Sequence, residues 1–180
     1  MINNEVNIQK EWLYKEFTLI TNAKIINIGV FRFIVAIFIP KFGVNYFYRK
    51  SRIHRLKNNK KRSYIFKILN YYLNHVDISS DAFLEFGVKF PHPQAIVIGG
   101  DSIIYQQTII LSCVTIGADS TKEPYHYPTI GRNCYIGTGA KIIGGINIGN
   151  NSIVGANAVV TKDFPDKSKL LGIPAKNINI

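Results

Sequence analysis

Residues 136–160 read IGTGAKIIGGINIGNNSIVGANAVV, and an aliphatic residue recurs in this stretch at every sixth position. Glycine follows that residue at Gly137, Gly149 and Gly155. A period of six matches neither the 3.6-residue turn of a helix nor the two-residue alternation of a simple strand. The repeating unit is therefore a short strand followed by a tight turn.

The same period extends to both sides of this stretch. The anchors that hold it are Ile78, Leu84, Phe90, Ile98, Ile104, Ile110, Ile116, Ile130, Ile136, Ile142, Ile148, Val154 and Val160. Two extra residues separate Phe90 from Ile98, and a longer insertion separates Ile116 from Ile130. Three units per coil stack into a triangular prism whose core the anchors fill, and we expect the glycines to adopt turn conformations that a Cβ would penalise. The pattern predicts a parallel β-helix over residues 76–165.

The remainder of the chain divides into two parts. Residues 1–75 form a basic α-helical region with 14 Lys and Arg against 3 Asp and Glu, and residues 166–180 form a C-terminal tail. Residues 76–180 hold 8 Lys and Arg against 8 Asp and Glu, so the net charge of +11 belongs to the helical region.

Helical spacing is clearest near the end of the basic region. Ser63 is a candidate N-cap, and Ile65, Ile68, Leu69 and Tyr72 follow it at i, i+3, i+4, i+7 spacing. This spacing predicts a helix with one apolar face.

The most apolar stretch, residues 25–40, does not predict a membrane span. It is shorter than the roughly 20 residues that a spanning helix needs, and Arg32 interrupts it at a cost of about 3 kcal/mol in a bilayer centre. We interpret it as a buried or interfacial helix. The N-terminus lacks the pattern of a secretory signal, and Cys113 and Cys134 have the spacing of no metal or redox motif. We therefore expect a cytoplasmic protein with both thiols reduced and buried.

The basic stretch RKSRIHRLKNNKKR, residues 49–62, is expected to be exposed. It has three interpretations: a solvated face, a peripheral contact with an anionic membrane, or a nucleic-acid contact. No recognisable reading element accompanies the charge, so we rank nucleic acid last and expect none as a partner.

Residues 136–165, followed by Gly-Ile-Pro-Ala-Lys at residues 172–176, resemble the hexapeptide-repeat acyltransferases. The resemblance implies a left-handed parallel β-helix, a homotrimer with active sites between subunits, and acetyl-CoA as acyl donor. No metal is expected, because only His92 and His126 lie in the repeat region. Carbonic anhydrases that share this fold need a three-histidine zinc site.

The short insertion in the repeat carries the first candidate for chemistry. It contains Pro91, His92 and Pro93, and because a stacked coil cannot absorb extra residues, the insertion must bulge outward. Prolines on both sides stiffen the bulge. We therefore expect His92 to be held on the outside of the prism, either as a catalytic residue or as an exposed corner histidine.

Within the superfamily, residues 76–100 resemble the serine acetyltransferases, which carry an Asp in the first coil and a His fifteen residues later. Asp77 and His92 have that separation. The resemblance implies that His92 is the general base and Asp77 its orienting partner. An imidazole with a pKa near neutral suits removal of a hydroxyl proton, and a carboxylate on the other ring nitrogen fixes the tautomer.

Other positions differ from the serine acetyltransferases. Pro91 replaces the acidic residue that precedes their base, and His126, Tyr127 and Pro128 replace their Arg-His-Pro. Together with the short N-terminal region, these differences favour the acetyltransferases of capsule and colanic-acid synthesis. We therefore expect an acetyl-CoA-dependent O-acetyltransferase that acts on a sugar or glycan in surface polysaccharide biosynthesis, with His126 and Tyr127 as acceptor contacts. The alternatives are a serine O-acetyltransferase of cysteine biosynthesis and a non-catalytic scaffold.

The same resemblance assigns candidate contacts for acetyl-CoA. Ala140 and Ala158 match positions that line the groove on the outer face. Thr161, Lys162 and Lys176 match segments that receive the nucleotide end, where a lysine supplies a point charge for phosphate.

Overall fold

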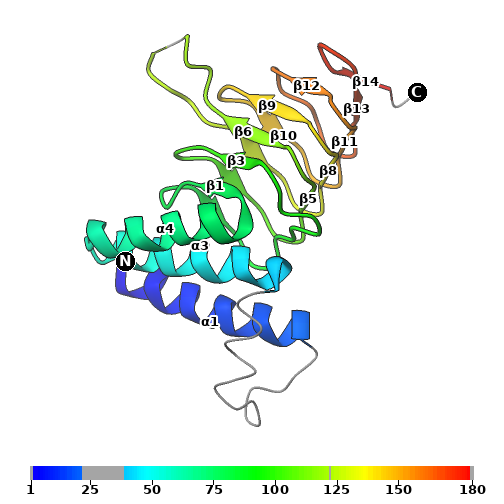
Figure 1. Cartoon of the computed structure of the whole chain (residues 1–180). Coiled ribbons are helices and arrows are strands. Elements are labelled where there is room, and N and C mark those ends of the chain that lie inside the picture. The colour runs from blue at the N-terminus through cyan, green and yellow to red at the C-terminus, as the bar shows by residue number, and fades with distance from the viewer. Residues whose placement is uncertain (1, 22–38, 122, 179–180) are drawn as a thin grey trace.

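The computed structural model describes residues 2–21, 39–121 and 123–178. Short strands form a triangular prism, and helices pack against its N-terminal end (Figure 1). The apolar helix expected over residues 25–40 lies outside the described residues as far as residue 38. No helix in the described part of the chain is long and apolar enough to span a membrane.

The described helices are α1 (Ile2–Thr21), α3 (Pro40–Leu56) and α4 (Lys60–Asn74). The middle helix, α3, contacts both of the others, and Figure 1 shows the three side by side below the first coil. α4 continues directly into β1 (Val76–Ile78). The helical region therefore covers the end of the prism where the repeat begins.

The strands form three sheets, one for each side of the prism. The first sheet holds β1, β3 (Ile96–Ile98), β6 (Thr115–Gly117), β9 (Lys141–Ile143) and β12 (Val159–Val160). The second holds β2 (Phe83–Leu84), β4 (Ile103–Ile104), β7 (Thr129–Ile130) and β10 (Asn147–Ile148). The third holds β5 (Ile109–Ile110), β8 (Tyr135–Ile136), β11 (Ile153–Val154), β13 (Lys169–Leu171) and β14 (Lys176–Asn177).

As far as β13, consecutive strands lie in different sheets, so the chain winds around the prism coil by coil. The strand pairs are parallel, apart from the antiparallel pair of β13 and β14 at the C-terminal end. The parallel β-helix with its N-terminal helical segment is thus confirmed. The parallel ladder also continues beyond residue 165, because β13 pairs with β11 and Leu170 takes the next buried anchor position.

The predicted anchors form the core of the prism. All thirteen have at most 2% of their surface exposed, and those in one sheet stack directly, as Ile98 on Ile116 and Ile116 on Ile142. Burial of one such side chain contributes about 1.5–3 kcal/mol relative to its exposure. Because each anchor packs on the next coil, the six-residue register is strongly fixed.

The glycines that follow the anchors have a different role from the one we expected. A Cβ added to Gly131 or Gly137 would lie 2.7 Å from the backbone nitrogen of the next coil, at Asn150 or Ala156. Neither glycine has a positive φ. These positions therefore require glycine because neighbouring coils approach closely, and not because the turn needs a left-handed conformation.

Left-handed residues instead recur three positions before the buried anchors of the first and third sheets. They are His75, Gly87, Ala95, Gln107, Cys113, Asn133, Gly139, Asn151, Asn157 and Lys167. Asparagine tolerates this conformation better than most residues, which accounts for its recurrence. Cys113 is consequently exposed at a corner, contrary to our expectation, whereas Cys134 is buried and its burial raises the pKa of the thiol.

Close packing of the coils can be tested at two equivalent glycines. Gly137→Ala should lower the free energy of unfolding by about 1–3 kcal/mol, the usual cost of overpacking, because its Cβ meets the backbone of Ala156. Gly117→Ala is the matched control, since nothing lies within 4 Å of an added Cβ there. Urea unfolding followed by circular dichroism measures both, and equal losses would contradict the close-approach argument.

Helix α4 forms where the spacing predicts it, but its apolar face is exposed and its N-cap is not Ser63. The N-cap is Asn59, whose side chain accepts a hydrogen bond from the backbone of Arg62. The buried residues of α4 are polar: Ser63, Asn70 and Asn74. Its exposed large apolar residues are Tyr64, Ile65, Leu69, Tyr71, Tyr72 and Leu73. The predicted apolar face is therefore directed away from the rest of the protomer.

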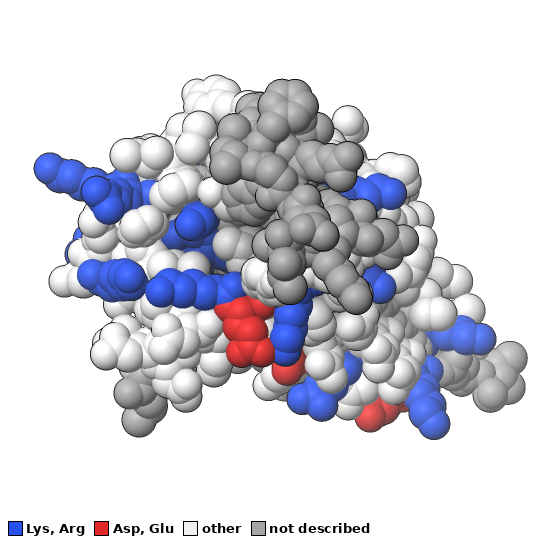
Figure 2. Space-filling view, turned by 90° about the horizontal axis from the view of Figure 1, so that it is seen from below, with Lys and Arg blue, Asp and Glu red and all other residues white. Residues whose placement is uncertain are grey.

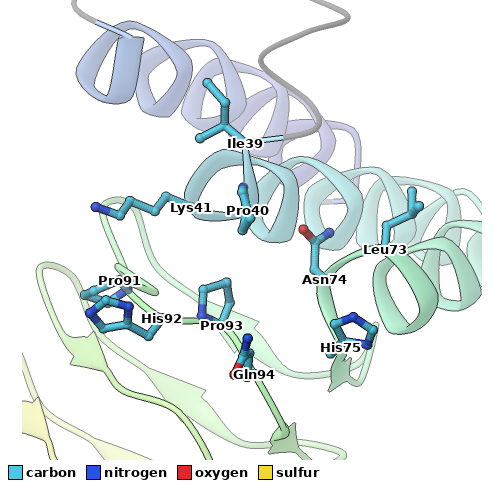
Figure 3. Close-up of a pocket in the computed structure, with 10 residues that line it drawn as sticks. All are labelled: Ile39, Pro40, Lys41, Leu73, Asn74, His75, Pro91, His92, Pro93 and Gln94. Carbon is cyan, nitrogen blue, oxygen red and sulfur yellow. The ribbon is translucent and has the colours of Figure 1, made fainter.

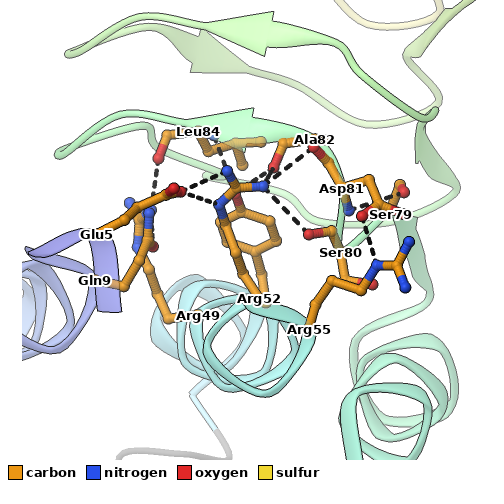
Figure 4. A network of polar contacts seen from close by, with 11 residues as sticks. Glu5, Gln9, Arg49, Arg52, Arg55, Ser79, Ser80, Asp81, Ala82 and Leu84 are labelled. Atoms are coloured by element: carbon orange, nitrogen blue, oxygen red, sulfur yellow. Dashed lines mark hydrogen bonds and ion pairs between the residues drawn. The ribbon is translucent and has the colours of Figure 1, made fainter. Parts of the chain in front are cut away.

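The basic stretch was expected to be exposed, but part of it holds the helices to the prism (Figure 4). Arg49 has no exposed surface. Its guanidinium donates to Glu16 and Gln9 of α1 and to the carbonyl oxygens of Leu84 and Glu85 in the first coil, at 2.5–3.3 Å. One side chain thus links α1, α3 and the first coil.

Two further arginines of α3 also pair internally. Arg52 pairs with Glu5 and donates to the carbonyl of Ala82 at 2.8 Å, and Arg55 pairs with Asp81 at 2.6 Å. On the helical face seen in Figure 2, Lys and Arg are still more numerous than Asp and Glu. The three arginines nevertheless pair within the protomer. The membrane contact that we considered for this stretch has no structural support.

The buried arginine should matter far more for stability than an exposed one. Arg49→Met should lower the free energy of unfolding by about 3–5 kcal/mol, because it leaves the carboxylate of Glu16 buried and unpaired. Arg55→Met removes a pair whose partners are 38% and 43% exposed, and should cost at most about 1 kcal/mol. Thermal unfolding compares the two variants, and similar losses of stability would contradict the structural role of Arg49.

Candidate functional site

The insertion that carries His92 leaves the prism at the corner between the third and the first sheet. Lys89 makes an isolated bridge to β5 of the third sheet, and β3 of the first sheet begins at Ile96. Between them, Pro93 is buried and His92 is exposed. The carbonyl of His92 accepts a hydrogen bond from the backbone of Gln94 at 2.9 Å. A tight local turn therefore presents this imidazole on the outside of the coil.

His92 lies at the edge of a cavity of about 450 Å³ between the insertion and the helical region. The cavity is lined by Ile39, Pro40, Lys41, Leu73, Asn74, His75, Pro91, His92, Pro93 and Gln94 (Figure 3). Its walls are the first turn of α3, the end of α4 and the insertion itself. Proline is favoured in the first turn of a helix, and Pro40 stands at that position of α3. That signal could have located Lys41 at the start of α3.

Asp77 has a different partner in the protomer from the one we expected. It lies on the outer face of β1, and its carboxylate pairs with Lys67 of α4 at 2.9 Å. A cavity of about 240 Å³, lined in part by Tyr64 and Tyr71, adjoins this pair. In the described part of the chain, His92 makes no side-chain hydrogen bond or ion pair, and His75 shares its cavity instead of Asp77.

His126 and Tyr127 belong to the long insertion between β6 and β7, at the corner between the first and the second sheet. The ring of Tyr127 lies over Gly99 and Gly100, where an added Cβ would collide with it. The Cβ of His126 lies over Gly145 in the same way. Residues next to each other in sequence therefore contact coils on opposite sides of the insertion.

The two histidines of the repeat region leave the prism at different corners. His92 precedes a strand of the first sheet, whereas His126 precedes a strand of the second. The first sheet separates these corners, so the two imidazoles leave the protomer at opposite ends of one side of the prism.

The candidate contacts for acetyl-CoA are spread over two sides of the prism. Ala140 and Ala158 are fully buried in the core, so our expectation that they lie on the outer face is wrong. Thr161 lines a cavity of about 210 Å³ together with His126. Lys162 lies over the ring of Phe164, with the nitrogen 5.5 Å from its centre. Lys176 lies on β14, on the side of the third sheet.

The other described histidine on the helices, His54, has a structural environment. Its ring stacks on Phe66 at 5.4 Å. Burial, and next the positive charges of Arg62, Lys50 and Lys57, lower the pKa of His54 below its ordinary value of 6.5. Among the described residues, no group of three or more His, Cys, Asp or Glu side chains is placed to hold a metal ion.

Comparison with known proteins supports the fold and changes the functional expectation. A family model described as bacterial transferase hexapeptide (six repeats) matches residues 127–162. A serine acetyltransferase from Synechococcus elongatus is 34% identical over 110 residues, which are 61% of this chain and 45% of the relative. A serine acetyltransferase from Haemophilus influenzae is 35% identical over 58% of this chain and 39% of the relative. The chain thus spans less than half the length of these two curated relatives.

Solved structures agree with this comparison. The soybean serine acetyltransferase apoenzyme superposes with a TM-score of 0.73 and 28% identity, over 76% of this chain and 57% of that one.

The expectation of a polysaccharide acetyltransferase is therefore wrong, because the relatives found by sequence and by structure are serine acetyltransferases. The differences at Pro91 and His126 concern single positions, and they do not outweigh the similarity over more than half of the chain. The left-handed parallel β-helix agrees with the match of residues 127–162 to the hexapeptide-repeat transferase model.

Proposed function

We propose that the protein is an acetyl-CoA-dependent O-acetyltransferase that acetylates the hydroxyl group of serine, with His92 as general base. One observation carries the proposal: His92 is exposed at a stiff insertion and lines a cavity, in a chain that resembles serine acetyltransferases over 61% of its length in sequence and 76% in structure.

The reaction follows from the properties of an imidazole. A nitrogen of His92 accepts the proton of the serine hydroxyl as its oxygen attacks the thioester carbonyl, and a bond forms between that oxygen and the acetyl carbon. The carbon–sulfur bond then breaks, and the imidazolium returns the proton to the sulfur of coenzyme A. The products are O-acetylserine and free coenzyme A. General acid–base catalysis of this kind contributes about 10²–10⁴-fold to the rate.

Asp77 enters the proposal by resemblance, and its ion pair with Lys67 limits the role that we give it. A carboxylate that shares its charge with a lysine stabilises an imidazolium less than one that faces the imidazole alone. We therefore expect replacement of Asp77 to lower the rate of acetyl transfer less than replacement of His92. The pair also fixes the carboxylate on the outer face of β1, 2.9 Å from the lysine nitrogen.

The proposed active enzyme is a homotrimer with sites between subunits. Support comes from the separate corners of His92 and His126, which a neighbouring copy brings together. The exposed apolar residues of α4 are a second support, because a contiguous apolar surface of this kind usually marks a contact with another molecule. In this assembly His126 of one subunit contacts the acceptor bound near His92 of the next.

The proposal assigns the donor to the groove along the coils. Thr161, which shares a cavity with His126, and the exposed lysines Lys162 and Lys176 are our candidates for the nucleotide end of acetyl-CoA. The acyl donor is an intracellular metabolite, so the proposal places the enzyme in the cytoplasm.

Replacement of the proposed base is the direct test. His92→Ala should lower kcat/KM for serine by about 10²–10⁴-fold, and Asp77→Asn should lower it less, while size-exclusion mass stays unchanged. His54→Gln is the control, because His54 stacks on Phe66 of α4 and lies outside the proposed site. Release of free coenzyme A is followed with a thiol reagent. A His92→Ala protein with full turnover would exclude this base, and a wild-type protein without transfer to serine would exclude the function.

A shared active site makes a second prediction. His126→Ala should lower kcat/KM by at least about tenfold, since it removes an acceptor hydrogen bond. Equal amounts of the His92→Ala and His126→Ala chains, co-expressed with different tags, should form mixed trimers with one intact site. Random assembly then restores about one quarter of wild-type activity. Activity no higher than the mean of the two separate variants would rule out a site shared in this way.

A further inference from the structure

The ionisable side chains that line the cavity beside His92 are all basic. They are Lys41, His75 and His92, and no Asp or Glu is among the described residues that line the cavity. The remaining polar side chains are the amides of Asn74 and Gln94. In such surroundings an anionic group is favoured over a cationic one.

Lys41 is the permanent cation of this cavity. It lies in the first turn of α3 and is exposed, and it has no ion-pair partner in the described part of the chain. By contrast, Arg52 and Arg55 of the same helix are both paired with carboxylates. Figure 3 shows the side chain of Lys41 extending toward the insertion that carries Pro91 and His92. The lysine is therefore available to a ligand at the place where the base lies.

We propose that Lys41 binds the carboxylate of the acceptor and so makes this enzyme selective for a hydroxyl compound that carries a negative charge. The inference rests on the proposed function, because it assumes that the hydroxyl reacts at His92. In this arrangement the hydroxyl of the acceptor contacts the imidazole at the edge of the cavity, and its carboxylate extends into the cavity that Lys41 also lines. An ammonium ion of lysine then meets the carboxylate as a compact point charge.

The position of Pro91 is consistent with this selectivity. Pro91 lines the cavity directly beside His92 and offers neither a charge nor an N–H group. Recognition of the acceptor must therefore come from other walls, and the start of α3 supplies the cation. This makes the helical region part of the acceptor site and not only a cap on the prism.

The role of Lys41 predicts a loss that depends on the charge of the acceptor. Lys41→Met should raise KM for L-serine by about 10- to 100-fold, the range for a hydrogen bond to a charged group. KM for acetyl-CoA should stay unchanged. With L-serinamide, which lacks the carboxylate and keeps the ammonium group, Lys41→Met should not raise KM, because the variant loses no attraction and removes a like charge. Lys41→Arg should retain part of the preference because it keeps the charge.

The control is Lys61→Met, which removes the same charge from an exposed position on α4, and it should leave both acceptors unaffected. Equal losses with serine and serinamide, or a raised KM for acetyl-CoA, would overturn the proposed role of Lys41. So would an unchanged KM for serine.

Binding measured without turnover separates this inference from the proposed function. Calorimetric titration of the wild type with L-serine should show binding that Lys41→Met weakens by the same factor, whether or not acetyl transfer occurs. A wild type that binds serine through Lys41 but does not acetylate it would refute the proposed function alone. A wild type that acetylates serine but binds it equally well after Lys41→Met would refute the inference alone, and absence of serine binding would refute both.

Discussion

The stacking of each aliphatic anchor on the anchor one coil away is the constraint on which this protein depends. The anchors of a sheet are in direct parallel register, and they are almost completely buried. A one-residue slip would turn every anchor of a strand outward. The strands of the prism therefore cannot accommodate an inserted or deleted residue. Extra residues can be accommodated only at the corners, where the chain turns. Both insertions lie at corners, and each carries one of the two histidines of the repeat region.

The helical region is held to the prism by polar contacts to a greater degree than its composition suggests. Arg49 reaches from α3 to backbone carbonyl groups of the first coil, and the buried hydroxyl of Tyr48 donates to Ala82 and accepts from the amide of Leu84. Burial raises the pKa of Tyr48, so this hydroxyl keeps its proton and remains a donor. Such directional contacts fix the orientation of the helices as well as their stability. The consequence is a defined wall for the cavity beside His92.

Much of the fold could be predicted from sequence because the relevant physics is local and periodic. A large apolar residue at every sixth position specifies its own burial, and the thirteen anchors needed no long-range information. The glycines show the limit of this reasoning: their spacing was visible, but the reason for them is the backbone of the next coil, which sequence does not display. The prediction that Ala140 and Ala158 lie on the outer face was wrong for a related reason. A small residue fits equally well under a groove or inside a core, and only the three-dimensional packing separates the two.

The candidate site was harder to predict because its walls come from distant parts of the chain. The insertion could be identified from a break in the repeat, but Lys41 is separated from His92 by 51 positions and belongs to a different periodicity. Comparison of single positions also misled us about the acceptor. Pro91 was taken as the loss of an amino-acid site, although a binding site can keep its substrate class when the charged contact moves to another element. The cavity combines an imidazole held by the prism with a cation held by a helix, and the polar contacts of α3 fix the position of that helix. Under the proposed role of Lys41, a change in those contacts alters acceptor recognition without touching either residue.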